Sequence, residues 1–511
     1  MSDINAGGAG STGYAGSAGS ANRSLAAMAA AANPGQPDDS SGAVVWMYQR
    51  QKKIYPRSVS GRFATWRWTL VWVTQLLFYG LPWLSWNDRP AVLFDLGARR
   101  FYIGALVLYP QDFIYLTGAL VISALALFLF TAVAGRLWCG FACPQTVYTE
   151  LFMWVERVIE GERAARMRLD AGGWTLTKLW RKSAKHAVWI AIGLWTGLTF
   201  VGYFTPIRSL SSEALALSFG PWEWFWILFY GLATYGNAGW LREQVCKYMC
   251  PYARFQSAMF DKDTLIIGYD AARGEPRGPR GKKTDLAQAG LGTCIDCRLC
   301  VHVCPTGIDI RQGLQYECIG CAACVDVCDG VMDKMGYPPG LIRYDTENGL
   351  AQQLPGQDQG WIQAWRHVLR PRVLVYSAIL GLIVLGFGAS LAMRQPFRVD
   401  VVRDRAVMAR QAQDGEVENV YRLQLMNATE KPQRLALGVE GLPGIHVEGR
   451  HEFALASAQA QWVVVSVRLA PDAAAKAGAG AHPIHFQLAL VDAAGQTGAT
   501  VTEKSSFVVP R

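Results

Sequence analysis

Two cysteine runs near the middle of the chain restrict its fold more than any other feature. The first is Cys294-Ile-Asp-Cys297-Arg-Leu-Cys300-Val-His-Val-Cys304, and the second repeats its spacing at Cys318, Cys321, Cys324 and Cys328. In such runs a short loop brings three thiolates to one iron-sulfur cube, and the fourth cysteine binds the neighbouring cluster. We therefore predict two 4Fe-4S clusters on crossed-over cysteine sets. The first set is Cys294, Cys297, Cys300 and Cys328, and the second is Cys318, Cys321, Cys324 and Cys304.

Two zinc sites could use the same cysteines, because C-x2-C pairs also bind zinc. Zinc motifs usually separate their cysteine pairs by a longer loop, so the iron-sulfur interpretation is favoured. The second run departs from the first at one position, because Cys304 is followed by Pro305 and Cys328 by Asp329. The difference concerns loop geometry and leaves the ligands in place.

The composition places part of the chain in a membrane. Its 511 residues are enough for several domains. With 51% hydrophobic and only 17% charged residues, the chain is too apolar for a wholly soluble protein. The net charge of +9 is concentrated beside apolar runs, where Lys and Arg act as orientation signals. No motif that reads DNA or RNA occurs, so we expect a lipid bilayer and no nucleic acid as partner.

Residues 1–43 are mainly Ala, Gly and Ser and cannot bury enough apolar surface to offset the entropy of ordering, so we expect a disordered tail. The membrane region 44–260 contains four apolar segments, and a fifth follows the ferredoxin runs. Each is near the length that crosses about 30 Å of hydrocarbon. The five segments are 68–86, 113–134, 187–205, 222–240 and 373–392. Phe101–Tyr109 is too short to span, and we expect it at the membrane interface.

Basic residues in the flanks predict the orientation of these segments. Six Lys or Arg residues lie within 50–67 and nine within 136–185, whereas the connection 205–221 has only Arg208. With five spans, the N-terminus, the 135–186 loop and 241–372 face the cytoplasm, and the C-terminus lies outside. All twelve cysteines then lie in or beside cytoplasmic segments, where thiols stay reduced.

Four further cysteines form a duplicated motif. Trp138-Cys139-Gly-Phe-Ala-Cys143-Pro144 follows the second apolar segment, and Val245-Cys246-Lys-Tyr-Met-Cys250-Pro251 follows the fourth. The duplication predicts four thiols facing one another at the cytoplasmic membrane face, as a metal or redox site. Sulfur ligands, with Met249 nearby, favour Cu(I) or an iron-sulfur cluster over hard ions. A reversible disulfide is a third alternative. The alternative without a chemical function is that these cysteines are small buried residues that pack at helix ends.

Two soluble domains complete the predicted fold class, a multi-domain membrane protein with an α-helical bundle of about five spans. Residues 261–360 form an inserted cytoplasmic ferredoxin-like domain with two clusters. Residues 396–511 alternate apolar and polar in short stretches, which is typical of an all-β immunoglobulin-like sandwich in the periplasm. The expected strands are 420–426, 433–439, 462–469, 484–491 and 506–509.

Together these features resemble the FixG/CcoG family of cytochrome oxidase accessory proteins. The resemblance rests on the apolar segments, both C-x3-C-P motifs, the ferredoxin cysteines and the β-rich end, and it covers most of the chain after the tail. It implies maturation of cbb3-type cytochrome c oxidase by reduction of Cu(II) to Cu(I). Copper ions, copper-delivery proteins or oxidase subunits would be partners. Copper would be held near Cys139, Cys143, Cys246 and Cys250, with electrons arriving from the clusters.

Two other functions fit parts of the pattern. NapH-like membrane subunits, which pass quinol electrons onward, share four spans, two C-x3-C-P motifs and a ferredoxin unit. The fifth span and the sandwich are surplus to that role. A non-catalytic assembly factor would use the clusters only to stabilise its fold. The sequence contains no credible nucleotide-binding motif, so the electron donor is a partner protein or a quinol that the sequence does not identify.

Overall fold

The computed structural model describes residues 53–352, 369–404, 409–412, 414–491 and 496–510. The architecture below is that of the unit formed by residues 54–511. The expected tail 1–43 lies outside the described residues, as does the part of the expected 261–360 domain beyond residue 352.

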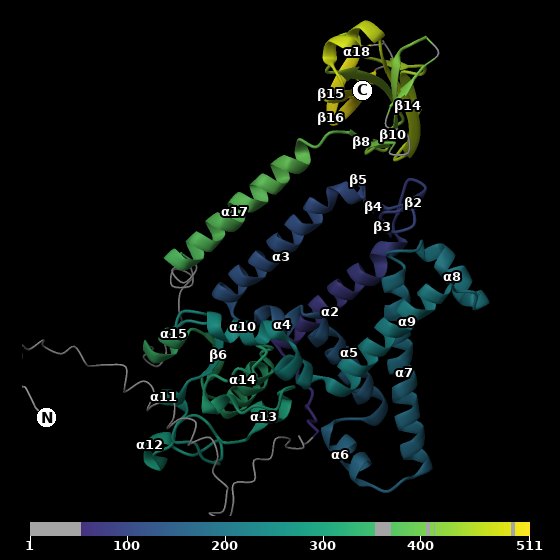
Figure 1. Cartoon of the computed structure of the whole chain (residues 1–511). Helices are drawn as coiled ribbons and strands as arrows, with labels where there is room; N and C mark the ends of the chain where they lie inside the picture. The colour runs from purple at the N-terminus through teal and green to yellow at the C-terminus, as the bar shows by residue number, and fades with distance from the viewer. Residues whose placement is uncertain (1–52, 353–368, 405–408, 413, 492–495, 511) are drawn as a thin grey trace, which may run out of the picture. The chain divides into compact units, whose positions relative to one another are not determined.

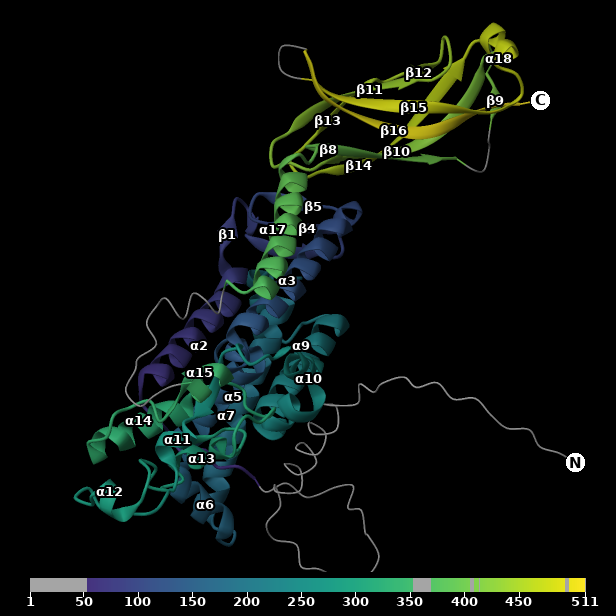
Figure 2. The same cartoon turned by 90° about the vertical axis from the view of Figure 1, so that its left-hand side faces the viewer.

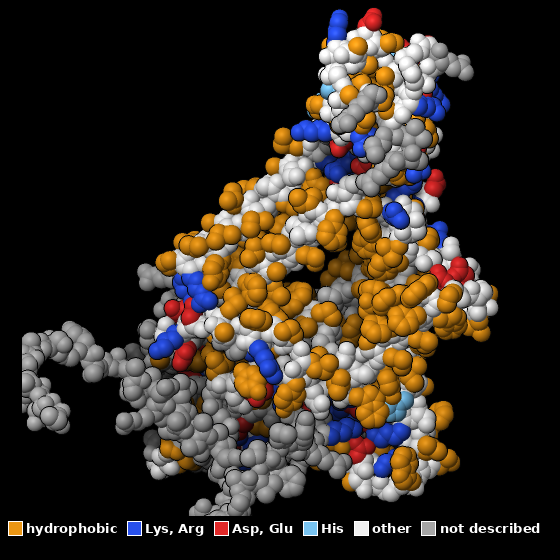
Figure 3. Space-filling view, in the orientation of Figure 1, with side chains coloured by type: hydrophobic (Ala, Val, Ile, Leu, Met, Phe, Trp, Pro, Cys, Tyr) orange, Lys and Arg blue, Asp and Glu red, His pale blue; other side chains and the backbone are white. Residues whose placement is uncertain are grey.

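Long apolar helices form the membrane part of the chain (Figure 1). Among the described residues, three helical stretches are long and apolar enough to cross a membrane: Pro110–Ala134, Leu176–Val201 and Pro371–Ala392. They contain the helices α3 (Phe113–Ala134), α7 (Leu176–Val201) and α17 (Pro371–Ala392). Figure 3 shows apolar side chains along α3 and α17, where Ile114, Leu382 and Leu385 are among the most exposed. Exposed apolar surface on this scale is suited to lipid rather than to water.

The first expected segment, 68–86, is displaced toward the N-terminus. Helix α2 runs from Arg62 to Gly80 and is followed by a 3-10 turn, Leu81–Trp83, and by strand β1, Ser85–Trp86. Pro82 lies in that turn and has no N–H to donate, so the α-helix ends before it. The polar start of α2, which includes the buried Arg67, lowers the hydropathy of this helix.

The fourth expected segment, 222–240, is divided between two kinds of helix. Helix α9 covers Pro221–Thr234, and a π-helical stretch, η3, continues over Tyr235–Leu241. The 14 residues of α9 rise about 21 Å at 1.5 Å each, which is less than the hydrocarbon thickness. The described residues therefore supply three membrane-crossing helices by length and composition, rather than the expected five.

Glycines allow two of the apolar helices to approach closely. A Cβ at Gly197 of α7 would lie 2.2 Å from the carbonyl oxygen of Ile227 in α9, and one at Gly193 would lie 2.7 Å from that of Gly231. Small residues four positions apart are the usual means by which membrane helices bring their backbones together. The α7–α9 pair therefore includes direct backbone contact, in addition to side-chain packing such as that of Phe200 on Tyr230.

Shorter helices surround the ends of these apolar helices. They are α4 (Leu137–Phe141), α5 (Pro144–Glu160), α6 (Arg163–Ala171), α8 (Ile207–Ala216), the π-helical turn η4 (Val245–Met249) and α10 (Pro251–Met259). A buried ionic network joins α5, α6 and α7. The carboxylate of Glu156 is 3.1 Å from Arg166, 3.4 Å from Lys185 and 3.0 Å from Arg242. Glu160 adds a 3.0 Å pair with Lys185.

The cysteine runs belong to a small α/β unit between α10 and α17, which Figure 2 shows from a second side. Its strands β6 (Ile266–Tyr269) and β7 (Ile342–Asp345) pair antiparallel. Its helices are α11 (Ala271–Gly274), α12 (Leu286–Ala289), α13 (Leu299–Val303), the 3-10 turn η5 (Ile310–Gln312), α14 (Ala323–Met335) and α15 (Glu347–Gln352). The core packs Ile267, Ile310 and Ile342 against the cysteines.

The C-terminal part is a two-layered β-sandwich. One sheet has the order β12-β14-β10-β8, with β9 paired to β10, and the other has the order β13-β11-β15-β16. The strands are β8 (Phe397–Arg403), β9 (Arg410–Gln411), β10 (Val417–Asn427), β11 (Gln433–Glu440), β12 (His446–Glu448), β13 (Glu452–Leu455), β14 (Ala460–Leu469), β15 (Gly480–Val491) and β16 (Thr497–Val509), with the short helix α18 (Pro471–Ala477) between β14 and β15. All five expected strands lie within these elements. Alternate residues such as Leu423, Leu435 and Phe486 fill the core between the sheets.

A small sheet between α2 and α3 was not expected. The segment Phe101–Tyr109, predicted at the membrane interface, instead supplies β4 (Arg100–Ile103) and β5 (Leu106–Leu108), which pair with β3 (Val92–Asp95); β1 pairs with β2 (Arg89–Pro90). The buried residues Val107 and Tyr109 share a core with Met426 of the sandwich. The Tyr109 hydroxyl donates to the carbonyl oxygen of Asn427 at 2.9 Å, so the sheet is tied to the C-terminal domain.

Candidate iron-sulfur and thiol site

The two cysteine runs fold into matching loop-and-helix units. The third cysteine of each run lies in the first turn of a helix, Cys300 in α13 and Cys324 in α14. The residue before each helix has a left-handed backbone, with φ 55° at Arg298 and 56° at Ala322. The same spacing thus produces the same turn twice.

Each loop-and-helix unit surrounds a cavity, and the fourth cysteines are exchanged between the two. One cavity is lined by thiols of the first run together with Cys328 of the second. The other is lined by thiols of the second run together with Cys304 of the first. Cys300 borders both cavities, so they are neighbours. One cavity is thus bordered by Cys294, Cys297, Cys300 and Cys328, and the other by Cys318, Cys321, Cys324, Cys304 and Cys300; the assignment of ligands to two clusters stays a prediction.

The cavities fit two iron-sulfur cubes in donor type and surroundings. Burial raises the pKa of Cys300 to about 11 and that of Cys328 to about 12, so without metal both thiols keep their protons at neutral pH. Iron binding would displace those protons. Among the described residues, no group of three or more His, Cys, Asp or Glu side chains is placed to hold a single metal ion. A cube binds its four thiolates at four separate irons, and the thiols around it lie farther apart.

The four C-x3-C-P cysteines come from two structurally equivalent corners. Cys139 lies in α4 and Cys246 in η4. Cys143 and Cys250 are the N-cap residues of α5 and α10, and both helices have proline at their first position. Proline suits that position because its missing N–H would have no partner in the helix. The duplicated motif thus becomes a duplicated turn into a helix that begins with proline.

Tertiary folding brings these four thiols into one electrostatic environment. Burial, together with the neighbouring Cys143 and Cys250, raises the pKa of Cys139 to about 11. Burial, together with the other three thiols, likewise raises the pKa of Cys246 to about 12. Buried thiolates that repel one another are stabilised by a bound cation, and soft sulfur favours a soft metal. The Cys139 thiol meanwhile donates to Gln256 Oε1 at 3.4 Å.

The site of the four C-x3-C-P thiols contacts the loop that carries Cys318 and Cys321, and backbone atoms form this contact. A Cβ at Gly140 would lie 2.5 Å from the carbonyl oxygen of Gly320, which precedes Cys321. Arg136 adds hydrogen bonds from the same corner, donating to the carbonyl oxygens of Cys318 at 3.0 Å and Ala253 at 2.8 Å. Glycine at both contact positions makes this close approach possible, because neither carries a side chain.

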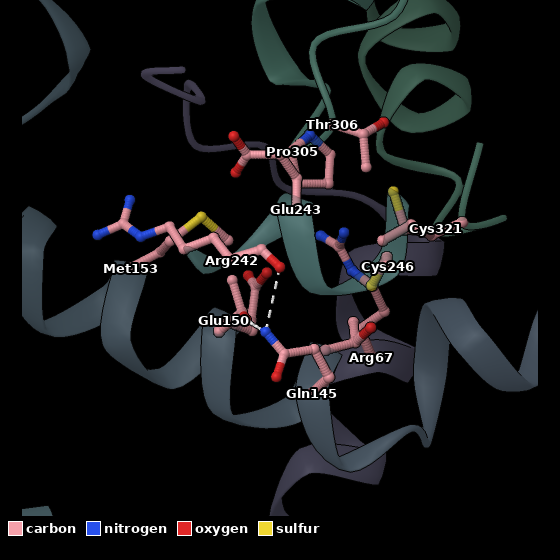
Figure 4. Close-up of a pocket in the computed structure, with 13 residues that line it drawn as sticks. Arg67, Gln145, Glu150, Met153, Arg242, Glu243, Cys246, Pro305, Thr306 and Cys321 are labelled. Atoms are coloured by element: carbon pink, nitrogen blue, oxygen red, sulfur yellow. Dashed lines mark hydrogen bonds between the residues drawn. The ribbon is translucent and has the colours of Figure 1, made fainter. Parts of the chain in front are cut away.

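A cavity connects the two sites and is drawn in Figure 4, where Cys246 and Cys321 both appear on its wall. Its remaining labelled lining combines charged, polar and apolar residues: Arg67, Gln145, Glu150, Met153, Arg242, Glu243, Pro305 and Thr306. Gln145 Nε2 donates to the carbonyl oxygen of Arg242 at 3.2 Å, which fixes the chain just before Cys246. Lys247 Nζ donates to the carbonyl oxygen of Thr306 at 3.1 Å and joins the corner to the ferredoxin loop.

Several residues important for this assembly had no signal in the sequence. Asp326, between two cluster cysteines, accepts hydrogen bonds from the backbone N–H groups of Phe63 at 3.1 Å and Ala64 at 2.7 Å, at the start of α2. A carboxylate at a helix N-terminus is favoured by the helix dipole. Arg67, one turn further along α2, lines the cavity between the sites. Only the folded chain places an acidic residue of one domain against the first helix of another.

Three family models match separate parts of the chain. A 4Fe-4S dicluster domain matches residues 241–347, and a 4Fe-4S binding domain matches residues 116–160. A third model, the immunoglobulin-like fold at the C-terminus of FixG, matches residues 387–510. Apolar helices, iron-sulfur domains and a β-sandwich in one chain define the class: a membrane-anchored iron-sulfur protein.

Similar proteins narrow this class. Nitrogen fixation protein FixG of Rhizobium meliloti (strain 1021) is 42% identical over 423 residues, covering 78% of this chain and 81% of its own. Protein RdxA and Protein RdxB of Cereibacter sphaeroides are 37% and 40% identical, and each match covers 86% of the relative and 79% or 78% of this chain. The chain belongs to the FixG family. A solved structure of a FixG-related protein from Vibrio parahaemolyticus matches 22% of this chain and 97% of its own, with 26% identity and a TM-score of 0.20.

Proposed function

We propose that the chain is an electron-transfer protein that reduces Cu(II) to Cu(I) for assembly of cbb3-type cytochrome c oxidase. Copper is the substrate, and Cys139, Cys143, Cys246 and Cys250 are the residues that bind it. The observation that supports this proposal is the contact between the two sites: Gly140 meets Gly320 at backbone distance, and one cavity is bordered by Cys246 and Cys321.

The chemistry needs one electron for each copper ion. Iron-sulfur clusters, when bound, supply single electrons at potentials that the protein sets through charge and hydrogen bonds. The protein's own part is to hold both copper oxidation states without releasing the ion. Thiolates bind Cu(I) more tightly than hard ligands do, so they stabilise the product. Copper binding at thiols with raised pKa releases protons, which links affinity to pH.

The proposed arrangement has five spans in the bacterial inner membrane, with the N-terminus and cluster unit in the cytoplasm and the sandwich in the periplasm. Two contacts support an odd number of crossings. The start of α2 is capped by Asp326 of the cluster unit, whereas the sheet after α2 shares a core with Met426 of the sandwich. In this arrangement the sandwich docks oxidase subunits or copper-delivery proteins.

Copper reduction is tested with anaerobically purified protein that has been chemically reduced and then given Cu(II). We expect a copper(I)-specific chelator to detect one Cu(I) for each electron stored. The variants Cys139→Ser and Cys246→Ser should lose this activity while the signals of the two clusters in electron paramagnetic resonance remain. Met259→Leu, on the helix after Cys250, is the matched control and should keep it. Reduced protein with intact clusters that leaves Cu(II) unreduced would refute the proposal.

One observation favours a second candidate. The 4Fe-4S binding-domain match at 116–160 contains Cys139 and Cys143, so the four thiols could instead hold a third cluster and receive electrons from a quinol, as in NapH-like subunits. Iron content separates the two. The Cys139→Ser and Cys246→Ser variants should lose iron only if the site holds a cluster. A purely structural assembly factor is tested in cells, where the double variant would still support oxidase assembly.

A further inference from the structure

A second cavity lies next to the one in Figure 4, and the charged side chains among its mixed polar and apolar lining are mainly positive. It shares Arg67, Glu150, Met153 and Pro305 with that cavity and extends toward the chain segment before α2. Its wall carries four arginines against a single carboxylate. The charged lining residues are Arg57, Arg67, Arg157, Arg166 and Glu150.

Nearby carboxylates neutralise only part of this charge. Arg166 pairs with Glu156 at 3.1 Å and also donates to the carbonyl oxygen of Pro56 at 2.6 Å. Arg67 interacts electrostatically with Glu150 and, more weakly, with Cys321 and Asp326. Among the described residues, Arg57 and Arg157 form no ion pair. The other acids in this region are engaged elsewhere: Glu162 accepts from Ser58 at 2.9 Å, and Asp170 pairs with Lys182 and accepts from Tyr55.

Two of the arginines also have donor groups without partners. Arg67 and Arg166 are only 7% and 4% exposed, and the Nε of each makes no hydrogen bond among the described residues. A buried N–H that lacks an acceptor costs about 1–3 kcal/mol, so native proteins rarely leave one unless a ligand or water supplies the acceptor. Both side chains line the same cavity, which therefore offers donors as well as excess charge to a ligand.

We propose that this cavity binds a phosphate-type oxyanion. Guanidinium groups recognise such oxygens through paired N–H donors, and the four arginines come from the segment before α2, from α2 itself, from α5 and from α6. Trp68 and Trp154 line the same cavity and contact each other edge to face, with ring centroids 6.4 Å apart. Tryptophan beside basic residues at the end of a membrane helix is the setting in which proteins hold anionic lipid headgroups. The phosphate can come from such a lipid or from solution, and the ligand chemistry is the same.

The test uses the full-length protein. It is reconstituted in nanodiscs of phosphatidylcholine alone or of phosphatidylcholine with phosphatidylglycerol, then released into mild detergent for native mass spectrometry. In a second arm, inorganic phosphate is titrated into delipidated protein and followed by tryptophan fluorescence. The variants are Arg57→Gln and Arg157→Gln, which alter arginines that form no ion pair among the described residues. Arg168→Gln, exposed on α6 and outside the cavity, is the matched control.

Each result supports or refutes the site. Retained phosphatidylglycerol that falls at least tenfold in Arg57→Gln and Arg157→Gln, but not in Arg168→Gln, identifies a lipid headgroup as ligand. Phosphate binding lost in the same two variants alone identifies a soluble oxyanion. The proposal is overturned if neither ligand binds, or if the control loses as much binding as the cavity variants. Unchanged cluster spectra in every variant show that a loss of binding is not a loss of fold.

Discussion

The contact between Gly140 and Gly320 can be tested by adding one methyl group. In Gly140→Ala the new Cβ would lie 2.5 Å from the Gly320 carbonyl oxygen and 2.8 Å from Cys321 Cα. Two effects compete, because Gly140 lies inside α4, where alanine is favoured over glycine by about 1 kcal/mol. The atoms that it meets belong to the backbone and cannot rotate away, and overpacking of this kind costs about 1–3 kcal/mol. We expect the clash to prevail and the two sites to separate.

In a matched control, the same glycine-to-alanine change should increase the stability of the protein instead of lowering it. Gly330 lies within α14, and a Cβ there would meet nothing within 4 Å. Gly330→Ala should therefore stabilise the protein by about 0.5–1 kcal/mol. The assay is the rate at which the cluster absorbance is lost on heating under anaerobic conditions, together with the rate of Cu(II) reduction. Gly140→Ala should lose absorbance faster and reduce copper more slowly than the wild type. If it behaves like Gly330→Ala in both measurements, the two sites are not in contact.

Three further expectations concern the ionic network, the thiols and the helix pair. Glu156→Gln leaves Arg166 and Arg242 without a carboxylate partner and should destabilise the protein by about 3–5 kcal/mol in thermal unfolding, whereas Asp170→Asn, at the partly exposed rim, should cost about 1 kcal/mol or less. Metal-free protein should lose stability as the pH rises above 9, because the Cys246 thiol has a pKa of about 12 in the folded state and 9.0 in the unfolded state, so the unfolded state loses its proton first. Thermal unfolding midpoints measured across this pH range test this expectation. In Cys246→Ser the decrease of the midpoint with pH should be smaller. Gly197→Ala should weaken the α7–α9 contact, since its Cβ would lie 2.2 Å from the carbonyl oxygen of Ile227. Gly386→Ala in α17 is the control and should have no such effect, because its Cβ would meet nothing within 4 Å. If both variants show the same protection from protease, the close approach at Gly197 is contradicted.

The amino-acid sequence by itself determined the chemistry of the sites. The class of cofactor depends on spacing along a few residues, so iron-sulfur binding and the proline-started helices after the two C-x3-C-P motifs could be predicted without a fold. The strands of the sandwich could be predicted for the same reason, since alternation is a local pattern. The apolar segments were predicted as regions, but Pro82 and the π-helical stretch after Thr234 moved or divided two of them.

Tertiary structure alone decided which sites meet. The approach of Gly140 to Gly320, the capping of α2 by Asp326 and the core shared by Tyr109 and Met426 all join residues far apart in the sequence. Such contacts depend on the summed packing of whole elements, and no local periodicity records them. The same holds for the four arginines of the second cavity, which come from separate segments and form a site only because the chain folds them around one space.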